Sequence, residues 1–252
     1  MIDLTLTFPT RKRPGMLREF FQNVRGTVEN PESVEIIVQY DIDDPESAGV
    51  LEEVRQLYPT LRVIPIRREH GDNLSEDYYN WLVRNKVYHG KYMMVGGDDV
   101  RFLTPGWDRT IPEWIEGYLL DKPDRICCVY PLDRSTNKPK LEFEWGWFPI
   151  LTREAMDTLG WFFPKEARTW GADVLIATIF HAVGRLEGVR DTMVDHISYH
   201  VYTMPKDEVS HKMSEVFNKT KQEIGQYRNH GMIIDIERLR DGIRGVVKGK
   251  PV

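Results

Sequence analysis

The stretch KYMMVGGDDVRF (residues 91–102) combines an apolar run, two glycines and two adjacent aspartates. The apolar run is typical of a buried β-strand, so Asp98 and Asp99 follow near its carboxyl end. Two neighbouring carboxylates repel each other, and their burial is costly unless a partner compensates the charge. The partner is either a divalent cation that bridges them to phosphate oxygens or, in a simple turn, the local backbone N–H groups.

Three earlier segments have the same strand-like character. Residues 2–8, 34–40 and 61–66 are predicted strands. Ser75 is predicted to cap a helix that follows the third of them. Strands that are buried on both faces and separated by helices indicate a parallel, doubly wound sheet. The predicted helices carry apolar residues at helical spacing in three groups: Leu17, Phe20, Phe21 and Val24; Val50, Leu51, Val54 and Leu57; and Tyr78, Tyr79, Leu82 and Val83.

The second half of the sequence is less regular. It is predicted to contain a strand, an aromatic strand or ribbon, a short helix, a buried helix, a last strand and a polar helical stretch, at residues 125–131, 141–152, 152–160, 172–184, 188–200 and 206–229.

Polar residues gather where the first four predicted strands end. Ligands of parallel sheets bind at the carboxyl ends of the strands, so we expect four loops to converge on one crevice. The loops are Thr10 to Arg13, Asp41 to Asp44, Arg67 to Asn73, and Asp98 with Asp99.

The composition indicates a globular protein with a substantial core. Of 252 residues, 41% are hydrophobic and 11% are aromatic. The net charge of −5 argues against a general coating of nucleic acid, although residues 238–252 hold five Lys or Arg against one Asp. No apolar run is long enough to span a membrane and no signal-peptide pattern occurs, so we expect a cytoplasmic protein. Cys127 and Cys128 are adjacent, which fits reduced core thiols rather than a disulfide.

Several short motifs occur in the order found in one enzyme family. Over residues 2–210 the sequence resembles the glycosyltransferases of the GT-A fold, of the family-2-like kind. The motifs are TRKRP (10–14), EIIVQYD (35–41), GGDDV (96–100), FPILTREAMDTLGWFFP (148–164), WGAD (170–173) and VDHISYH (194–200).

The resemblance implies an α/β fold with a Rossmann-like, mostly parallel central sheet, flanking helices and a smaller acceptor-side region. It divides the chain into a nucleotide-sugar-binding half (1–130), an acceptor and catalytic half (131–205), and a C-terminal helical extension with a basic tail (206–252). It also implies a metal-dependent hexosyl- or pentosyltransferase that uses Mn²⁺ or Mg²⁺. The sugar would move, with inversion, from a nucleotide diphosphate sugar such as a UDP-sugar to a hydroxyl acceptor.

The implied metal ligands are Asp98, Asp99 and His196. The family's Asp-x-Asp motif would occupy positions 96–98, but residue 96 is glycine, so the choice between the two aspartates stays open. Neighbours on a strand point to opposite faces, so one carboxylate would take the ion while the other contacts ribose or a backbone amide. His200 is the alternative histidine, and a purely structural hydrogen bond is the alternative role for either one.

Asp173 is the implied general base. Inverting transfer needs a carboxylate that takes the proton of the acceptor hydroxyl. The alternative is structural, because Asp173 precedes an apolar helical run and is predicted to cap it.

Thr10, Arg13 and Asp41 are the implied donor-binding residues, together with Asp98. Cations and backbone amides after the first strand suit phosphate, and Asp41 would accept from the base or ribose. The remaining charged residues of these two loops are expected to be solvated. They are Arg11, Lys12, Asp43 and Asp44.

Tryptophans offer stacking surfaces for a sugar. Trp145, Trp147 and Trp170 lie near the motifs of the second half, and aromatic faces suit the C–H surface of a carbohydrate. Trp147 is the implied donor-site residue, with core packing as the alternative role for all three.

Two other functions remain open at this point. A sugar nucleotidyltransferase would show a glycine-rich phosphate loop after the first strand, where this chain has only Gly15. A GT-A-like protein without turnover would only bind its ligand. The acceptor stays open among polysaccharide, lipid-linked sugar, protein and nucleic acid. A glycan and a hydroxymethylated DNA base are the candidates, with the TRKR loop and the basic tail as possible contacts for a DNA backbone.

Overall fold

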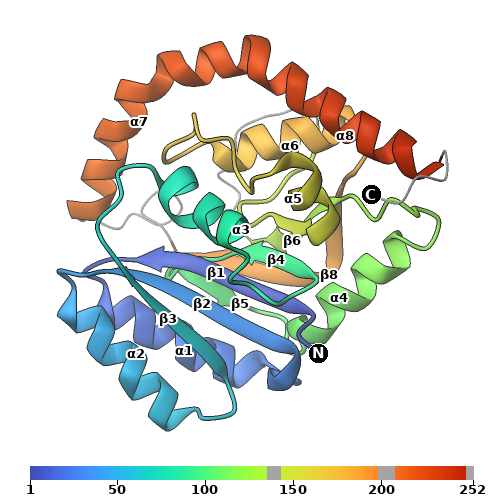
Figure 1. Ribbon diagram of the computed structural model, residues 1–252. Helices are drawn as coiled ribbons and strands as arrows, with labels where there is room; N and C mark the ends of the chain where they lie inside the picture. Colours follow the sequence, from blue (N-terminus) through green and yellow to red (C-terminus); the bar gives the residue numbers. More distant parts are fainter. Residues whose placement is uncertain (135–142, 198–207, 248–252) are drawn as a thin grey trace.

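The computed structural model of the chain describes residues 1–134, 143–197 and 208–247. The first half alternates strands and helices, as the apolar spacing predicts (Figure 1). In order, it contains β1 (Leu4–Thr10), α1 (Pro14–Thr27), the 3₁₀ turn η1 (Pro31–Ser33), β2 (Val34–Asp41), α2 (Pro45–Leu57), β3 (Arg62–Arg68), the π-helical turn η2 (Leu74–Asn80), α3 (Trp81–Asn85) and β4 (Tyr92–Val95).

The second half adds shorter strands and more helices. Its elements are β5 (Val100–Phe102), α4 (Trp107–Tyr118), β6 (Cys128–Asp133), β7 (Ile150–Thr152), α5 (Arg153–Leu159), α6 (Ala172–Ala182), β8 (Leu186–His196), α7 (Glu208–Gln226), η3 (Tyr227–Gly231) and α8 (Met232–Val247). The sequence analysis missed β5 and α4. β5 has only three residues and exists through its antiparallel pairing with β8, which local spacing does not reveal.

Within the described residues the strands form one eight-stranded sheet in the order β3-β2-β1-β4-β7-β6-β8-β5. The β3, β2, β1 and β4 strands are parallel neighbours, so the predicted parallel sheet is confirmed there. The β7 strand runs antiparallel to both β4 and β6, whereas β6 and β8 are parallel. The carboxyl ends of β1, β2, β3 and β4 therefore share one edge, which is where the polar loops lie.

Helices cover both faces of the sheet (Figure 1). Tyr92 and Met94 of β4 belong to the core cluster that contains the apolar residues of α1 and α2. Met93 and Val95, on the other face, belong to the cluster of α3, α5 and α6. This alternation along a strand that is buried on both sides is the expected result of its continuous apolar sequence.

Three local predictions are wrong: the helix cap at Ser75, the burial of Leu57 and the extent of the aromatic strand. Ser75 does not cap η2, because Asn73 accepts from the Glu76 backbone N–H while the Ser75 hydroxyl donates to the carbonyl of Ala167. Leu57, predicted on the buried face of α2, is 61% exposed in the last helical turn.

The aromatic strand predicted for 141–152 is limited to β7. Residues 141 and 142 lie outside the described part, and residues 143–149 form no strand. Trp145 is buried and packs on Tyr130 and α6, with Phe143 and Trp147 against the same cluster, so the aromatic residues do not alternate across a strand.

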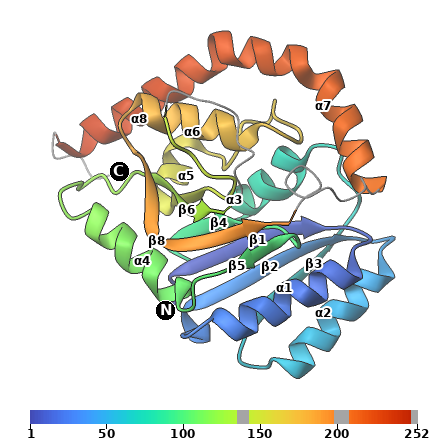
Figure 2. The ribbon, with the colours of Figure 1, turned by 180° about the vertical axis from the view of Figure 1, so that it is seen from behind.

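The C-terminal helices α7 and α8 curve around the α5 and α6 side of the molecule (Figure 2). The described part of the predicted basic tail is helical, and Lys248 and Lys250 lie outside the described residues. Among the described residues, no helix is both long and apolar enough to cross a membrane. Three arginines of α8 form ion pairs one turn apart: Arg238 with Asp235, Arg240 with Glu237, and Arg244 with Asp241.

Cys127 and Cys128 are buried free thiols, as predicted. Burial raises the pKa of the Cys127 thiol to about 12, so this residue is uncharged at neutral pH.

Candidate active site

Asp98 and Asp99 occupy the turn between β4 and β5. The Val100 N–H donates to the carbonyl of Gly97 at 3.2 Å, which closes this turn around the two aspartates. The two aspartates thus lie in the loop after β4, as predicted, and the alternation of neighbours on a strand does not apply to them. Their carboxylates nevertheless diverge to different partners, because each accepts from side chains of other segments.

Asp98 points toward the end of β1 and is buried. The Thr10 hydroxyl donates to Asp98 Oδ2 at 2.7 Å, and Arg13 approaches Oδ1 at 3.3 Å. Burial raises the pKa of Asp98 to about 6, against the opposing effect of the Arg13 charge. The sequence prediction placed Thr10, Arg13 and Asp98 at one site, and the structure brings these three together.

Asp99 faces β8 instead. The register of the β5–β8 pair places Val100 opposite His196, and the Ile197 N–H donates to the Asp99 carbonyl at 2.8 Å. This pairing brings His196 Nε2 within 3.4 Å of Asp99 Oδ2. Burial alone would raise the pKa of Asp99 and lower that of His196, but their mutual attraction and hydrogen bond reverse both shifts.

The Asp99–His196 pair fits a divalent cation. Carboxylate and imidazole suit Mn²⁺, and the two candidate ligand atoms, Asp99 Oδ2 and His196 Nε2, face each other at 3.4 Å. Among the described residues, no group of three His, Cys, Asp or Glu side chains is close enough to hold a metal. The remaining ligands would therefore come from phosphate oxygens and water. The alternative histidine, His200, lies outside the described residues.

Asp173 lies in the first turn of α6. The N-cap is Gly171, at a φ of +86°, and it makes no side-chain capping bond, so the predicted capping role of Asp173 is wrong. Its Oδ2 atom is buried and has no hydrogen-bond partner among the described residues. Burial raises the pKa of Asp173 to about 7, although backbone hydrogen bonds and the His196 charge oppose this. A carboxylate in this state is suited to proton transfer near neutral pH.

Asp41 ends β2 and is buried. Its Oδ1 accepts from the Tyr78 hydroxyl at 2.8 Å, and its Oδ2 contacts His70 Nδ1 at 2.7 Å and the Arg11 guanidinium. Arg11 also forms a two-pronged ion pair with Asp43, so the expectation of a solvated Arg11 is wrong. Sequence analysis missed Tyr78 and His70, because Tyr78 fits the apolar stripe of a helix equally well.

Asp44 is buried, contrary to the prediction of a solvated turn residue. It caps α2 by accepting from the Ser47 N–H at 3.1 Å and the Ser47 hydroxyl at 2.7 Å. It also accepts from the Lys12 backbone N–H at 2.6 Å. The loop after β1 is thereby tied to the start of α2, which supports the position of Arg13.

The tryptophans differ in their surroundings. Trp147 is partly buried, with its ring centre 5.7 Å from that of His196. Trp145 is 3% exposed and packs edge-on against Trp147 at 4.9 Å. Trp170 lies farther along the chain, with its ring centre 6.0 Å from that of Phe217 in α7. Trp147 thus lies next to His196 of the carboxylate site, and Trp145 packs against Trp147.

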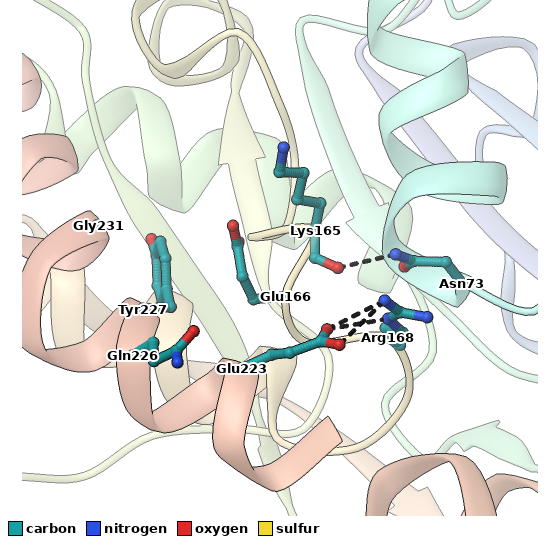
Figure 3. Close-up of a pocket in the computed structure, with 8 residues that line it drawn as sticks. All are labelled: Asn73, Lys165, Glu166, Arg168, Glu223, Gln226, Tyr227 and Gly231. Carbon is teal, nitrogen blue, oxygen red and sulfur yellow. Dashed lines mark hydrogen bonds and ion pairs between the residues drawn. The ribbon is translucent and has the colours of Figure 1, made fainter. Parts of the chain in front are cut away.

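A separate pocket of about 490 Å³ lies between the loop before α6 and the helices α7 and η3 (Figure 3). Arg168 and Glu223 form an ion pair in its wall, and the Lys165 carbonyl accepts from Asn73. None of Asp98, Asp99, His196 or Asp173 lines it. The pocket adds no group to the carboxylate site.

Solved structures of low sequence identity share this architecture. The mannosyltransferase PcManGT from Pyrobaculum calidifontis, in complex with GDP-Man and Mn²⁺, matches with a TM-score of 0.59 and 13% identity, covering 99% of this chain and 76% of its own. TarS 1–349 from S. aureus, in complex with UDP, matches with a TM-score of 0.58 and 11% identity over 99% of this chain and 92% of its own. GalNAc-T7 with UDP, GalNAc and Mn²⁺ matches with a TM-score of 0.58 and 14% identity, covering 91% of this chain and 58% of its own. No protein-family model and no curated protein matches the sequence.

These matches identify the fold. The chain has the GT-A fold of nucleotide-sugar glycosyltransferases, so the α/β fold predicted from the order of its motifs is confirmed. At these identities the likeness extends to the fold alone, and activity has to be argued from the site.

Proposed function

We propose that the chain is a metal-dependent glycosyltransferase that moves a sugar, with inversion, from a nucleotide diphosphate sugar to a hydroxyl acceptor. One observation carries this proposal: at the carboxyl edge of a GT-A sheet, the Asp99–His196 pair lies within electrostatic range of Asp173, whose Oδ2 atom has no hydrogen-bond partner among the described residues. A pair of side chains that can bind a cation, placed beside a carboxylate base, is the arrangement that sugar transfer from a nucleotide diphosphate sugar requires.

The donor would bind over the ends of β1, β2 and β4. Arg13 offers a cation to the diphosphate, and Thr10 fixes the Asp98 carboxylate that faces the same crevice. Asp41 would accept from the ribose or base, most simply of a UDP-sugar, in exchange for or beside its contact with His70. Trp147 would lie against the transferred sugar, next to His196.

The metal, Mn²⁺ or Mg²⁺, would be held by Asp99 and His196, with Asp98 close behind in the same turn. When bound, it would neutralise charge on the departing diphosphate. The preference for Mn²⁺ follows from the imidazole ligand.

Asp173 would act as the base. Its carboxylate takes the proton of the acceptor hydroxyl while that oxygen forms a bond to the anomeric carbon. The bond from this carbon to the diphosphate oxygen breaks, and the electron pair leaves with the nucleotide diphosphate. A single displacement of this kind inverts the configuration.

Nucleotide release from UDP-, GDP- and dTDP-sugars with Mn²⁺ tests the proposal. We expect the wild type to release nucleotide from one of these donors and D173N to lose about 10²-fold or more of the transfer rate. D191N, at an exposed aspartate of β8, is the matched control. Pyrophosphate release from a nucleoside triphosphate and a sugar phosphate would instead indicate a nucleotidyltransferase. Donor binding without turnover would indicate a binding protein.

A further inference from the structure

Asp41, the candidate acceptor for the ribose or base, is already engaged by the chain itself. Its side chain is 2% exposed, and both of its carboxylate oxygens have partners. The Tyr78 hydroxyl donates to Oδ1, whereas Arg11 and His70 contact Oδ2. A carboxylate has room for further donors, but burial closes the approach to them. A nucleoside therefore reaches this carboxylate only where one of the three partners moves aside.

Two of the three partners are held by additional contacts. Tyr78 is 5% exposed in η2, and its hydroxyl also accepts from the Gly71 N–H at 3.1 Å. Arg11 donates from both of its terminal nitrogens to Asp43, at 2.8 Å each. Movement of either side chain away from Asp41 would break or strain these further hydrogen bonds, so both are expected to stay in place.

His70 is the most accessible of the three partners. Its side chain is 33% exposed, against 22% for that of Arg11. It lies between the end of β3 and the start of η2, in a segment with no helix or strand (69–73). Its Nδ1 contacts Asp41 at 2.7 Å, whereas its Nε2 faces the exposed carboxylate of Asp72 at 3.7 Å. An exposed contact of that length contributes little, so an incoming ligand meets the imidazole first.

The backbone beside His70 is fixed, in contrast to its side chain. A Cβ on Gly71 would stand 2.5 Å from the Asp77 Cβ, so the segment packs directly against η2. The Asn73 N–H donates to Asp77 Oδ2 at 2.9 Å, and the Gly71 N–H adds the bond to Tyr78. His70 would therefore leave Asp41 by rotation of its side chain, while Tyr78 keeps its bond to the other carboxylate oxygen.

The contact that His70 makes has the chemistry of a nucleoside contact. An imidazole N–H that donates to a carboxylate makes the same kind of bond as a ribose hydroxyl or a base N–H. Asp41 also lies at the expected place, because the β1–β2 register sets Thr10 beside Tyr40, and Thr10 donates to Asp98 in the diphosphate crevice. His70 thus occupies the position that a donor group of a nucleoside would take.

We propose that His70 takes the place of the nucleoside on Asp41 in the unliganded chain and sets the affinity for the nucleotide donor by competing with it. The inference rests on the proposed function for the class of ligand, a nucleoside diphosphate, but its test needs no sugar transfer. Tyr78 is a positioning residue in this arrangement, because it acts on the ligand through Asp41. Two neighbours of one carboxylate should therefore have opposite effects: loss of the His70 ring strengthens nucleotide binding, and loss of the Tyr78 hydroxyl weakens it.

Calorimetry measures the two effects. UDP, GDP and dTDP, each with Mn²⁺, are titrated into the wild type, H70A, Y78F and the control H230A, at an exposed histidine of η3. Inorganic pyrophosphate with Mn²⁺ is the matched ligand without a nucleoside. We expect the preferred nucleotide to bind H70A about threefold to tenfold more tightly and Y78F about threefold to tenfold more weakly, with pyrophosphate binding unchanged in both. Unchanged or weaker nucleotide binding in H70A, or an equal gain in H230A, would overturn the proposal.

A second measurement uses the wild-type chain and holds even if H70A fails to fold. Diethyl pyrocarbonate modifies accessible imidazoles, and mass spectrometry locates the modified histidines. Saturating nucleotide with Mn²⁺ should raise the modification rate of His70, because the displaced ring turns toward solvent, and leave that of His230 unchanged. A lower rate at His70 would mean that it contacts the nucleotide, and an unchanged rate that it stays on Asp41; either result overturns the proposal.

The two measurements also separate this inference from the proposed function. If the wild type binds a nucleotide but transfers no sugar, the transferase function fails, and the H70A and Y78F affinities still decide the role of His70. If sugar is transferred but H70A binds nucleotide no more tightly than the wild type, the inference fails and the transferase function stands. Absence of nucleotide binding in both the wild type and H70A would overturn the inference as well.

Discussion

Replacing Asp173 with asparagine should remove activity and make the protein more stable at alkaline pH. The carboxyl titrates near 3.8 when exposed and near 7 in the folded chain, because burial disfavours its charged form. The difference corresponds to roughly 4 kcal/mol of destabilisation by the ionised form. The buried asparagine amide would itself lack partners, at a cost of about 1–3 kcal/mol. A net gain of about 1–3 kcal/mol is therefore expected for D173N at pH 8, or roughly 2–10 °C in Tm for a chain of this size.

The pH dependence gives this prediction its sign. Between pH 3.8 and 7 the folded state holds a proton that the unfolded state has lost, so stability falls as pH rises through this window. The advantage of D173N should be full above pH 7, disappear between about pH 4.5 and 6, and become a deficit of about 1–3 kcal/mol near pH 4. Thermal unfolding at pH 4, 6 and 8 measures it, with D191N, at an exposed position, as the control. A D173N variant that is no more stable than the wild type at pH 8, or that retains full transfer activity, would refute the assignment of Asp173 as a base whose charged form is disfavoured by burial.

Three other substitutions test the surroundings of this base. T10V removes the 2.7 Å hydrogen bond to the buried Asp98 carboxylate and should cost about 1–3 kcal/mol in urea unfolding; an unchanged midpoint would contradict that bond. H196N should raise the Mn²⁺ concentration needed for half-maximal nucleotide release by at least about tenfold, and an unaltered Mn²⁺ titration would exclude the histidine as a ligand. G146A forces a methyl group into Tyr130 and should cost about 1–3 kcal/mol, whereas full stability would show that the segment is free to move.

Local sequence pattern predicts the parallel half of this fold well, for a physical reason. Strands β1, β2 and β4 are buried on both faces, β3 is the partly exposed edge strand, and helices separate them, so each element carries its own signal. The β5 and β7 strands have three residues each and form through partners distant in the chain, such as β8 for β5. No window of sequence around them contains that information.

The residues of the candidate site also differ in whether local sequence reveals their partners. The order of strands and loops predicts that Thr10, Arg13 and Asp98 meet, because parallel strands end at one edge. The partners of Asp41 are less accessible to sequence reasoning. Tyr78 comes from the π-helical turn that replaces the predicted regular helix, and Arg11 reaches back from a loop that looks solvated.

Ion pairs within α8 bear on the choice between a glycan and a DNA acceptor. The basic tail suggested a phosphate contact, but Arg238, Arg240 and Arg244 each pair with a carboxylate three residues earlier in the same helix. A phosphate would have to compete with these internal partners, and it would release few counterions in doing so. These ion pairs weaken the case for a phosphate contact at the described part of α8.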